Sequence, residues 1–456
     1  MGGEYQAYPE SKDSGVEWVG KIPIGWDIKP LFSTVSTNAE KNVNGVETNV
    51  LSLSYGNIIK RDVETNFGLL PASFDTYQLI YPGDLVLRLT DLQNDKRSLR
   101  VGLAKEKGII TSAYLKLIAR SEDFESRFLY RQLHSYDTTK VFYGMGGGLR
   151  QSMKFEDMRR LPLLVPPIAE QTKISNFLDH ETVKIDTLID KQQQLIALLK
   201  EKRQAVISHA VTKGLNPDAP MKDSGFEWLG EVPEHWVVMQ IRRVLLEMEQ
   251  GKSPECESRS AEDDEWGVLK TSCVNKGDYN SGANKALPPH VPPFPQFEVK
   301  KGDLLMSRAS GSVDLIGSVA YVYETRSKIL LSDKVFRLHT SKKVNRIFFS
   351  YLMQSSFMRE NIKQAISGAE GMANNITKGA VVGFKFALPP VDEQEVIQEH
   401  ISSICKNINI LIYNSEKALQ LLRERRTALI SAAVTGKIDV RNWQQPTKTT
   451  ADKDTQ

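Results

Sequence analysis

One segment of this chain occurs twice, and the distance between the copies constrains the fold more than any other feature. Residues 12–26 read Lys-Asp-Ser-Gly-Val-Glu-Trp-Val-Gly-Lys-Ile-Pro-Ile-Gly-Trp, and residues 222–236 repeat the Lys-Asp-Ser-Gly, the Glu-Trp and the final Trp. Solenoid repeats recur after about 20 to 50 residues, and these copies lie much farther apart. Each repeat therefore has the length of a domain, and we expect two similar halves.

The duplication continues toward the end of each half, while the middle diverges. A Gly-Asp-Leu turn at residues 83–85 matches residues 302–304, and a Pro-Pro-x-x-Glu-Gln junction at residues 166–171 matches residues 389–394. This pattern is typical of a fixed frame that carries a replaceable surface. Between the repeated motifs, short apolar stretches broken by Gly, Pro and Asn indicate strands, with one helical patch in each half. We predict an α+β fold for each variable domain.

A long helix is expected after each Pro-Pro pair, because residues 168–213 and 391–435 contain neither Gly nor Pro. Apolar residues recur there at spacings of four and three, which is the heptad pattern of a coiled coil. A helix of about forty residues measures roughly 60 Å and needs a partner along its length. A pseudo-twofold axis between the halves would make the two helices an antiparallel coiled coil. The expected seam residues are Ile174, Leu178, Ile185, Leu188, Leu199, Ile397, Ile401, Ile408, Leu411 and Leu422.

The composition excludes several classes of protein. With 456 residues, 40% hydrophobic and 25% charged, the chain is long enough for two or three cores. Its three cysteines are too few for a disulfide framework, which favours a reducing compartment. No apolar run approaches the roughly 20 residues of a membrane span, and the first ten residues do not resemble a signal peptide. We expect a cytoplasmic protein without a membrane partner.

Polar and basic residues gather in the diverged middles, after the Gly-Asp turns and around later glycine-rich segments. Arg can bond guanine O6 and N7, and Asn or Gln can bond adenine N6 and N7, as a major-groove reader requires. The alternative at each position is a solvated loop. Candidate DNA contacts in the first half are Arg88, Thr90, Gln93, Asn94, Lys96, Arg97, Arg100, Tyr143, Arg150, Gln151 and Lys154. Those in the second half are Ser307, Arg308, Asn374, Asn375 and Lys378.

The motifs that catalysis or metal binding would need are missing from the sequence. The glycine run at residues 144–148 lacks the lysine and hydroxyl of a phosphate-binding loop, and no metal-ligand spacing or amino-methyltransferase motif occurs. Trp18, Trp26, Trp228 and Trp236 could stack on bases, but their repeated placement favours core packing. The chain is therefore predicted to recognise a binding partner and to contain no catalytic or metal site of its own.

The order of these motifs, repeated twice, resembles the specificity subunit of type I restriction-modification enzymes, and the resemblance covers nearly the whole chain. It rests on the Trp-x-Gly-x-x-Pro-x-x-Trp entries, the Gly-Asp-Leu turns, the Pro-Pro-x-x-Glu-Gln junctions and the helices that end in Ala-Val-Thr. The family implies target-recognition domains at residues 1–166 and 214–389, each reading half of a bipartite DNA target. It also implies conserved helices at residues 167–213 and 390–436, and we expect residues 437–456 to be a disordered tail.

The resemblance also implies partners. They are double-stranded DNA, two modification subunits that methylate adenine with S-adenosylmethionine, and restriction subunits that cut and translocate DNA in defence against foreign DNA. This chain itself would bind no cofactor and would be non-catalytic. The basic segment Gly-Leu-Arg-Gln at residues 148–151 corresponds to Gly-Ala-Glu-Gly-Met-Ala-Asn-Asn at residues 368–375, which has no basic residue. The two half-sites should therefore differ in sequence. The alternative is a scaffold without DNA affinity, in which a coiled coil presents two similar protein-binding domains; the formal net charge of only +3 favours it.

Overall fold

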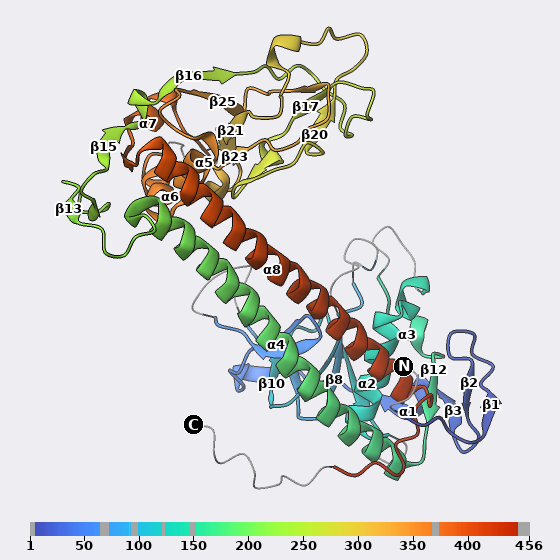
Figure 1. Cartoon of the computed structure of the whole chain (residues 1–456). Helices are drawn as coiled ribbons and strands as arrows, with labels where there is room; N and C mark the ends of the chain where they lie inside the picture. Colours follow the sequence, from blue (N-terminus) through green and yellow to red (C-terminus); the bar gives the residue numbers. More distant parts are fainter. Residues whose placement is uncertain are drawn as a thin grey trace. The chain divides into compact units, whose positions relative to one another are not determined.

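The chain folds into two compact units, each of which contains helices and strands as expected for the α+β class (Figure 1). The computed structural model describes residues 5–63, 73–90, 92, 99–120, 124–145, 152–366 and 374–445. One unit combines Met1–Gln192 with Lys417–Gln456, and the other is Gln193–Glu416. Each unit therefore includes one variable segment and part of both long helices.

The first unit is built on small antiparallel sheets. Its four-stranded sheet has the order β4 (Val35–Ser36), β11 (Leu115–Ala119), β8 (Leu85–Leu87) and β9 (Val101–Leu103). Four two-stranded pairs accompany it: β1 (Ser11–Asp13) with β2 (Lys21–Pro23), β3 (Asp27–Pro30) with β12 (Pro162–Val165), β5 (Leu51–Ser54) with β6 (Asn57–Lys60), and β7 (Gln78–Ile80) with β10 (Gly108–Ile110). The described helices contained wholly in this unit are α1 (Leu31–Thr34), α2 (Ser126–Thr138) and α3 (Phe155–Met158).

The second unit has a four-stranded sheet with a matching arrangement. Its order is β16 (Leu245–Gln250), β25 (Val335–Thr340), β21 (Leu304–Ser307) and β23 (Val319–Tyr321). Its smaller sheets are β13 (Met221–Asp223) with β14 (Glu231–Pro233), β15 (Val237–Gln240) with β27 (Lys385–Leu388), β18 (Val274–Asn275) with β19 (Asp278–Tyr279), β22 (Ala309–Ser310) with β26 (Asn374–Asn375), and β20 (Asn284–Ala286), β17 (Gly267–Leu269) and β24 (Ile329–Leu330). The described helices contained wholly in this unit are α5 (Arg346–Gln354), α6 (Ser356–Gln364) and α7 (Lys378–Gly383).

The two predicted long helices are confirmed as α4 (Ile168–Lys213) and α8 (Val391–Val434). Each begins directly after its Pro-Pro pair and is followed by a glycine with positive φ, Gly214 at 74° and Gly436 at 70°. A residue without Cβ adopts this left-handed conformation at little cost, so both glycines end their helices where the sequence predicts. No helix among the described residues combines the length and apolar character needed to cross a membrane.

In each unit, part of α4 packs antiparallel to part of α8 (Figure 1). In the first unit Asp186 of α4 pairs with Arg426 of α8 at 2.8 Å, and Lys173, nearer the start of α4, donates to the carbonyl of Arg441, beyond the end of α8. In the second unit Arg203 donates to Asn409 at 2.9 Å. Along α4, from Lys173 through Asp186 to Arg203, the contacted residues are Arg441, Arg426 and Asn409. The two helices therefore run in opposite directions.

The apolar contact between the helices follows the predicted seam only in part. The buried members are Ile174, Leu178, Ile185, Ile397, Ile401 and Ile408, and Leu199 and Leu422 are partly buried. The prediction is wrong for Leu188 and Leu411, which are 48% and 51% exposed. Ile189 and Ile412 are buried or partly buried beside them. The departure is local, because Leu199 and Leu422, farther along the two helices, lie on the predicted seam again.

The core of the first unit includes residues after α8 that we expected to be disordered. Ile438 and Val440 are 5% and 1% exposed, and the Trp443 ring makes an edge contact with Phe177 of α4 at 5.6 Å. The backbone N–H of Asp439 donates to the carbonyl of Gln6. The expected disorder is therefore wrong for residues 437–445, and the remainder of that tail lies outside the described residues.

Candidate nucleic-acid interface

The frame of each unit is held by the motifs that the sequence repeats. The Trp26 indole Nε1 donates to Glu170 at 3.0 Å, and the Trp236 Nε1 donates to Glu393 at 3.1 Å. Both indoles are buried, as predicted. The prediction of core packing is wrong for Trp18 and Trp228, which are 45% and 40% exposed, and each of their rings contacts one aromatic ring on a neighbouring helix, Tyr136 or Phe357.

The Gly-Asp turns place their aspartates in buried ion pairs at matching positions of the two sheets. Asp84 accepts the backbone N–H of Tyr81 and lies 2.9 Å from the Lys116 ammonium on β11. Asp303 accepts the backbone N–H of Lys300 and lies 3.2 Å from the Arg337 guanidinium on β25. Each carboxylate thus fixes the turn and ties two central strands together. The polar stretch that follows each turn therefore begins at a strand held in place by an ion pair.

In each unit the fold brings together two polar stretches that are distant in sequence. The carbonyl of Leu89 accepts a hydrogen bond from the Met153 N–H at 2.8 Å. In the second unit, the carbonyl of Arg308 accepts from the Ile376 N–H at 3.0 Å, and β22 pairs with β26. The segment after the Gly-Asp turn therefore lies beside the segment after the glycine-rich stretch, with the same backbone contact in both halves.

A basic surface surrounds this contact in the second unit. The Arg308 guanidinium donates to the Asp333 carbonyl at 3.2 Å, and the Lys378 ammonium donates to the Met248 carbonyl at 2.6 Å. Both cations lie near the ring of Phe336, at 5.9 and 5.7 Å. Asn374 and Asn375 stand on the paired strand β26 and are partly exposed. This arrangement can offer amides to base edges and positive charge to phosphates.

Asp333 organises this surface, although the sequence interpretation did not include it. Its carboxylate accepts from the Ser253 hydroxyl and pairs with Lys334 at 2.9 Å, while its carbonyl accepts from Gln250 and Arg308. Partial burial opposes ionisation, but the hydrogen bonds from Ser253 and Lys334 hold the pKa of the Asp333 carboxyl below its ordinary value. A lone Asp-Lys pair after a strand carries no sequence signal, so only the fold reveals this role.

Two predicted contacts face the interior, so the structure does not support them as DNA-binding residues. Arg100 is fully buried; its guanidinium donates to the Thr90 carbonyl at 2.6 Å and to the Tyr143 hydroxyl at 3.3 Å. Ser307 is also fully buried, because it ends the central strand β21. Arg100 therefore acts inside the fold and positions the segment that carries Arg88 and Thr90.

The other candidates in the first half are only partly described. Arg88 is partly buried, and Thr90 and Lys154 are exposed near the Leu89–Met153 contact. The Tyr143 ring lies 4.4 Å from the Lys140 ammonium and 5.6 Å from the Arg100 guanidinium. The candidates Gln93, Asn94, Lys96, Arg97, Arg150 and Gln151 lie outside the described residues.

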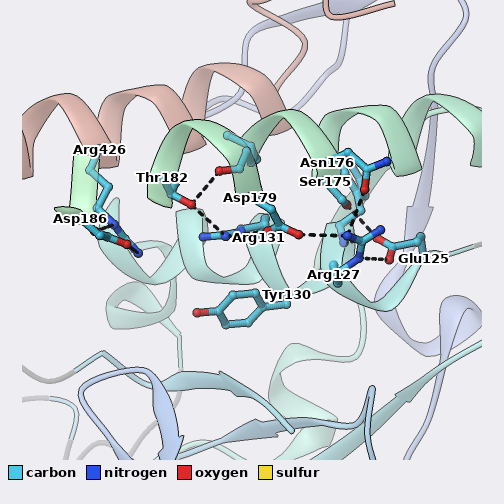
Figure 2. Close-up of polar contacts among 12 residues, drawn as sticks. Glu125, Arg127, Tyr130, Arg131, Ser175, Asn176, Asp179, Thr182, Asp186 and Arg426 are labelled. Carbon is cyan, nitrogen blue, oxygen red and sulfur yellow. Dashed lines mark hydrogen bonds and ion pairs between the residues drawn. The ribbon is translucent and has the colours of Figure 1, made fainter. Parts of the chain in front are cut away.

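A polar cluster that the sequence interpretation missed joins α2 to α4, and an ion pair beside it joins α4 to α8 (Figure 2). Arg127 and Arg131 of α2 both reach Asp179 of α4, each at 2.9 Å, and Arg426 of α8 pairs with Asp186 of α4. Since Asp179 and Asp186 are about half exposed, solvent screens these pairs and their value lies more in orientation than in stability. Within the described residues, no group of three or more His, Cys, Asp or Glu could hold a metal ion.

No protein-family model matches the chain. The EcoEI type I restriction enzyme specificity subunit of Escherichia coli is 28% identical over 267 residues, which cover 58% of this chain but only 44% of that subunit. The EcoKI specificity subunit of Escherichia coli strain K12 is 24% identical over 451 residues, covering 92% of this chain and 90% of that one. The MjaVIII specificity subunit of Methanocaldococcus jannaschii is 24% identical over 347 residues, covering 74% and 76%.

The fold is also similar to a solved one. A structure described as the basis of complex assembly and conformational transition of the type I R-M system matches 91% of this chain and 99% of its own, with a TM-score of 0.65 at 15% identity. The resemblance that the repeated motifs indicated is therefore confirmed in sequence by relatives of nearly full length and in fold by this structure.

Proposed function

We propose that this chain, which is similar in sequence and fold to the type I restriction enzyme specificity subunits, determines the DNA sequence that such an enzyme recognises. One observation carries the proposal beyond resemblance. The backbone contacts Leu89–Met153 and Arg308–Ile376 bring together the same two diverged, polar stretches in each half. A repeated scaffold that presents different side chains at one place is what two readers of two half-sites require.

The reading chemistry follows from the side chains at that place. In the second half, Asn374 and Asn375 supply amides that can bond an adenine edge, while Arg308, Lys334 and Lys378 supply charge for the phosphates nearby. In the first half, Arg88, Thr90 and Lys154 lie near the corresponding contact. The side chains differ between the halves, so the two half-sites differ in sequence.

The long helices set the spacing between the half-sites in this proposal. The two halves form an internal repeat about a pseudo-twofold axis, and α4 and α8 form an antiparallel coiled coil between the recognition domains at residues 1–166 and 214–389. Matching sheet orders and duplicated Trp–Glu hydrogen bonds support the repeat. The base pairs between the half-sites are then left unread, and their number follows from helix length.

The partners follow from the same function. The chain itself is a non-catalytic, cytoplasmic subunit that binds double-stranded DNA, two modification subunits and restriction subunits. S-adenosylmethionine binds the modification subunit, and this chain binds no cofactor. Enzyme chemistry on adenine is thereby delivered to sites that this chain selects.

The deciding experiment compares adenine methylation across the host genome with and without this chain. We expect loss of one split motif on deletion. Restoring the chain with Asn374→Ala and Asn375→Ala should return the motif with one half-site relaxed, whereas the control Asn275→Ala, on an exposed residue of β18, should return it unchanged. If deleting the chain leaves the methylation pattern unaltered, while partner subunits copurify with the chain from cells that contain it, the scaffold alternative is favoured.

A further inference from the structure

A short segment of the second unit, residues 250–254, lies beside the surface that we propose reads DNA. The segment begins at Gln250, the last residue of β16, which pairs with Phe336 of β25. Arg308 and Lys378 place their cations near the ring of Phe336, at 5.9 and 5.7 Å. The Lys378 ammonium also donates to a carbonyl of β16 itself. Residues 250–254 therefore leave the sheet next to two of the cations assigned to phosphates.

Hydrogen bonds and a close backbone contact fix this segment to the connection between β24 and β25. The Gln250 side chain donates to the Asp333 carbonyl at 2.9 Å. The Ser253 hydroxyl donates to the Asp333 carboxylate and accepts the Asp333 backbone N–H at 3.3 Å. Between these tethers, a Cβ on Gly251 would lie 1.8 Å from the Leu331 carbonyl oxygen. Since only glycine allows such an approach, the path of the backbone is fixed at both ends and in the middle.

The same connection also holds the polar stretch that follows the Gly-Asp turn. The Arg308 backbone N–H donates to the Lys334 carbonyl at 2.8 Å, and the Arg308 guanidinium donates to the Asp333 carbonyl at 3.2 Å. Asp333 thus bonds to Ser253 through its carboxylate and to Arg308 through its carbonyl. One residue therefore sets the position of residues 250–254 relative to the proposed reading surface.

Lys252 is the charged side chain that this segment presents. It is exposed, and its ammonium lies 4.6 Å from the centre of the Phe294 ring. Among the described residues, no carboxylate pairs with it. An aromatic face attracts a cation without neutralising its charge. Pro293 and Pro295 flank Phe294, and their fixed φ restricts the backbone that carries the ring. Lys252 is therefore a positive charge that is held in place and can bind an anion.

The charges at this place favour a polyanion over a single small anion. The Asp333 carboxylate pairs with one of the cations, Lys334, at 2.9 Å. Phosphates follow one another along a DNA strand, so cations from several segments can each meet a different phosphate. Four segments contribute one cation each, and these are Lys252, Arg308, Lys334 and Lys378.

The first unit has different residues at the matching place. When the two sheets are aligned on the ion pairs of the Gly-Asp turns, Asp333 and Lys334 correspond to Ser112 and Ala113. The Ser112 hydroxyl donates to the Thr76 carbonyl. The Ser253–Asp333 bond therefore has no counterpart at this described position of the first unit, and its effect should be confined to the half-site that the second unit reads.

We propose that residues 250–254 are a further DNA contact of the second unit, in which the Lys252 ammonium bonds a backbone phosphate beside the second half-site. The hydrogen bond between Ser253 and Asp333 positions this contact. The inference rests on the proposed function, which supplies DNA as the partner. A phosphate contact sets the register of a reader on the duplex and carries no base information. Asp333 is a positioning residue here, because its carboxylate bonds Ser253 and not the DNA.

The test measures how tightly the chain, in complex with its modification subunits, binds a duplex that carries the methylated motif, at a series of salt concentrations. Each phosphate contact contributes about 0.9 to the slope of log affinity against log salt, so Lys252→Ala should reduce that slope by about one. The matched control Lys342→Ala removes the same charge from an exposed position beyond the far end of β25 and should leave the slope unchanged. Asn374→Ala, measured in parallel, should relax a base of the second half-site without changing the slope.

A second measurement locates the phosphate. Phosphates beside the second half-site are replaced one at a time with neutral methylphosphonate, and one replacement should weaken binding by the wild type but not by Lys252→Ala. Ser253→Ala leaves every charge in place and should also lose this effect, whereas Ser253→Thr keeps the hydroxyl and should retain it. A merely structural role of Ser253 would weaken binding without changing the response to that phosphate.

The outcomes separate the inference from the function. An unchanged slope in Lys252→Ala, or an equal reduction in Lys342→Ala, would overturn the contact and leave the specificity function standing. A relaxed base in the motif methylated by Lys252→Ala would mean that the segment reads bases, and the phosphate contact would be wrong. Equal behaviour of Ser253→Ala and Ser253→Thr would overturn the positioning role of the Ser253–Asp333 bond. A wild-type complex that binds duplexes with and without the motif equally well would overturn both the inference and the function.

Discussion

Replacing Gln171 with leucine should destabilise the first unit by removing a side chain that satisfies two backbone groups at once. Gln171 is fully buried. Its Oε1 accepts from the Glu125 N–H at 2.9 Å, and its Nε2 donates to the Pro166 carbonyl at 2.9 Å. Glu125 is the N-cap of α2, and Pro166 precedes α4. One amide thus joins the starts of two helices.

The size of the effect follows from those two bonds. A buried backbone donor or acceptor left without a partner costs about 1 to 3 kcal/mol, so leaving two of them unpaired in Gln171→Leu should lower the free energy of unfolding by about 2 to 6 kcal/mol. For a domain of this size, each kcal/mol lowers Tm by about 2 to 4 °C, which gives a fall of about 10 °C. Urea unfolding measures the free energy, and hydrogen exchange of the Glu125 amide reports whether the loss is local.

Two further variants control this experiment. Gln194→Leu makes the same change on an exposed position of α4 and should shift stability by less than about 0.5 kcal/mol. Gln394 makes the matching bonds to Asn345 and Pro389, so Gln394→Leu should increase exchange at the Asn345 amide and not at Glu125. Unchanged stability of Gln171→Leu, or faster exchange at Asn345 in that variant, would refute the reasoning.

Three other predictions follow from the same structure. Arg100→Met should lower the free energy of unfolding by about 2 to 4 kcal/mol and leave the methylated motif unchanged, because the Arg100 guanidinium bonds inside the fold. An altered half-site without a loss of stability would instead show that Arg100 contacts DNA. Burial and the nearby Arg426 and Arg131 lower the pKa of His134 to about 4. The unfolded chain therefore binds more protons between about pH 4 and 6.5, and the free energy of unfolding should fall by roughly 3 kcal/mol as pH is lowered through that range. This pH dependence should be absent from His134→Phe, and an equal pH dependence in that variant would contradict the prediction. Inserting seven residues into both long helices adds about 10 Å to each and should lengthen the spacer of the methylated motif by about three base pairs at 3.4 Å per pair, whereas an unchanged spacer would exclude the helices as its determinant.

The repeated parts of the fold could be predicted from sequence because duplication gave each residue a second, independent occurrence. Trp26 and Trp236, the Glu-Gln junctions and both helix ends at Gly214 and Gly436 were visible in this way. The spacing of apolar residues also located the long helices, although the assumption of a strict heptad misplaced the buried residue at Leu188 and Leu411.

The interface could be predicted less well, because burial there depends on contacts between distant segments. Arg100 lies in a polar, basic stretch that locally suits a DNA contact. Its burial requires Tyr143 and the acceptor at Thr90, and its backbone N–H bonds to Asp137 of α2. The α2–α4 cluster was missed for a related reason. Arg127 and Arg131 resemble any charged pair on a helix surface, and the second half has Ile347 and Tyr351 on the corresponding helix, so the duplication gave no signal.

The fold separates the contacts that hold it together from the side chains that we propose read a target. The central sheets are tied by buried ion pairs, Asp84 with Lys116 and Asp303 with Arg337, and the polar stretches are joined through backbone atoms. Backbone hydrogen bonds such as Arg308–Ile376 persist when side chains change. If Asn374 and Asn375 read the target as we propose, substitutions there should therefore alter the sequence that is read with little loss of stability. A chain built in this way can acquire a new half-site in one unit while the other unit and the long helices keep their contacts.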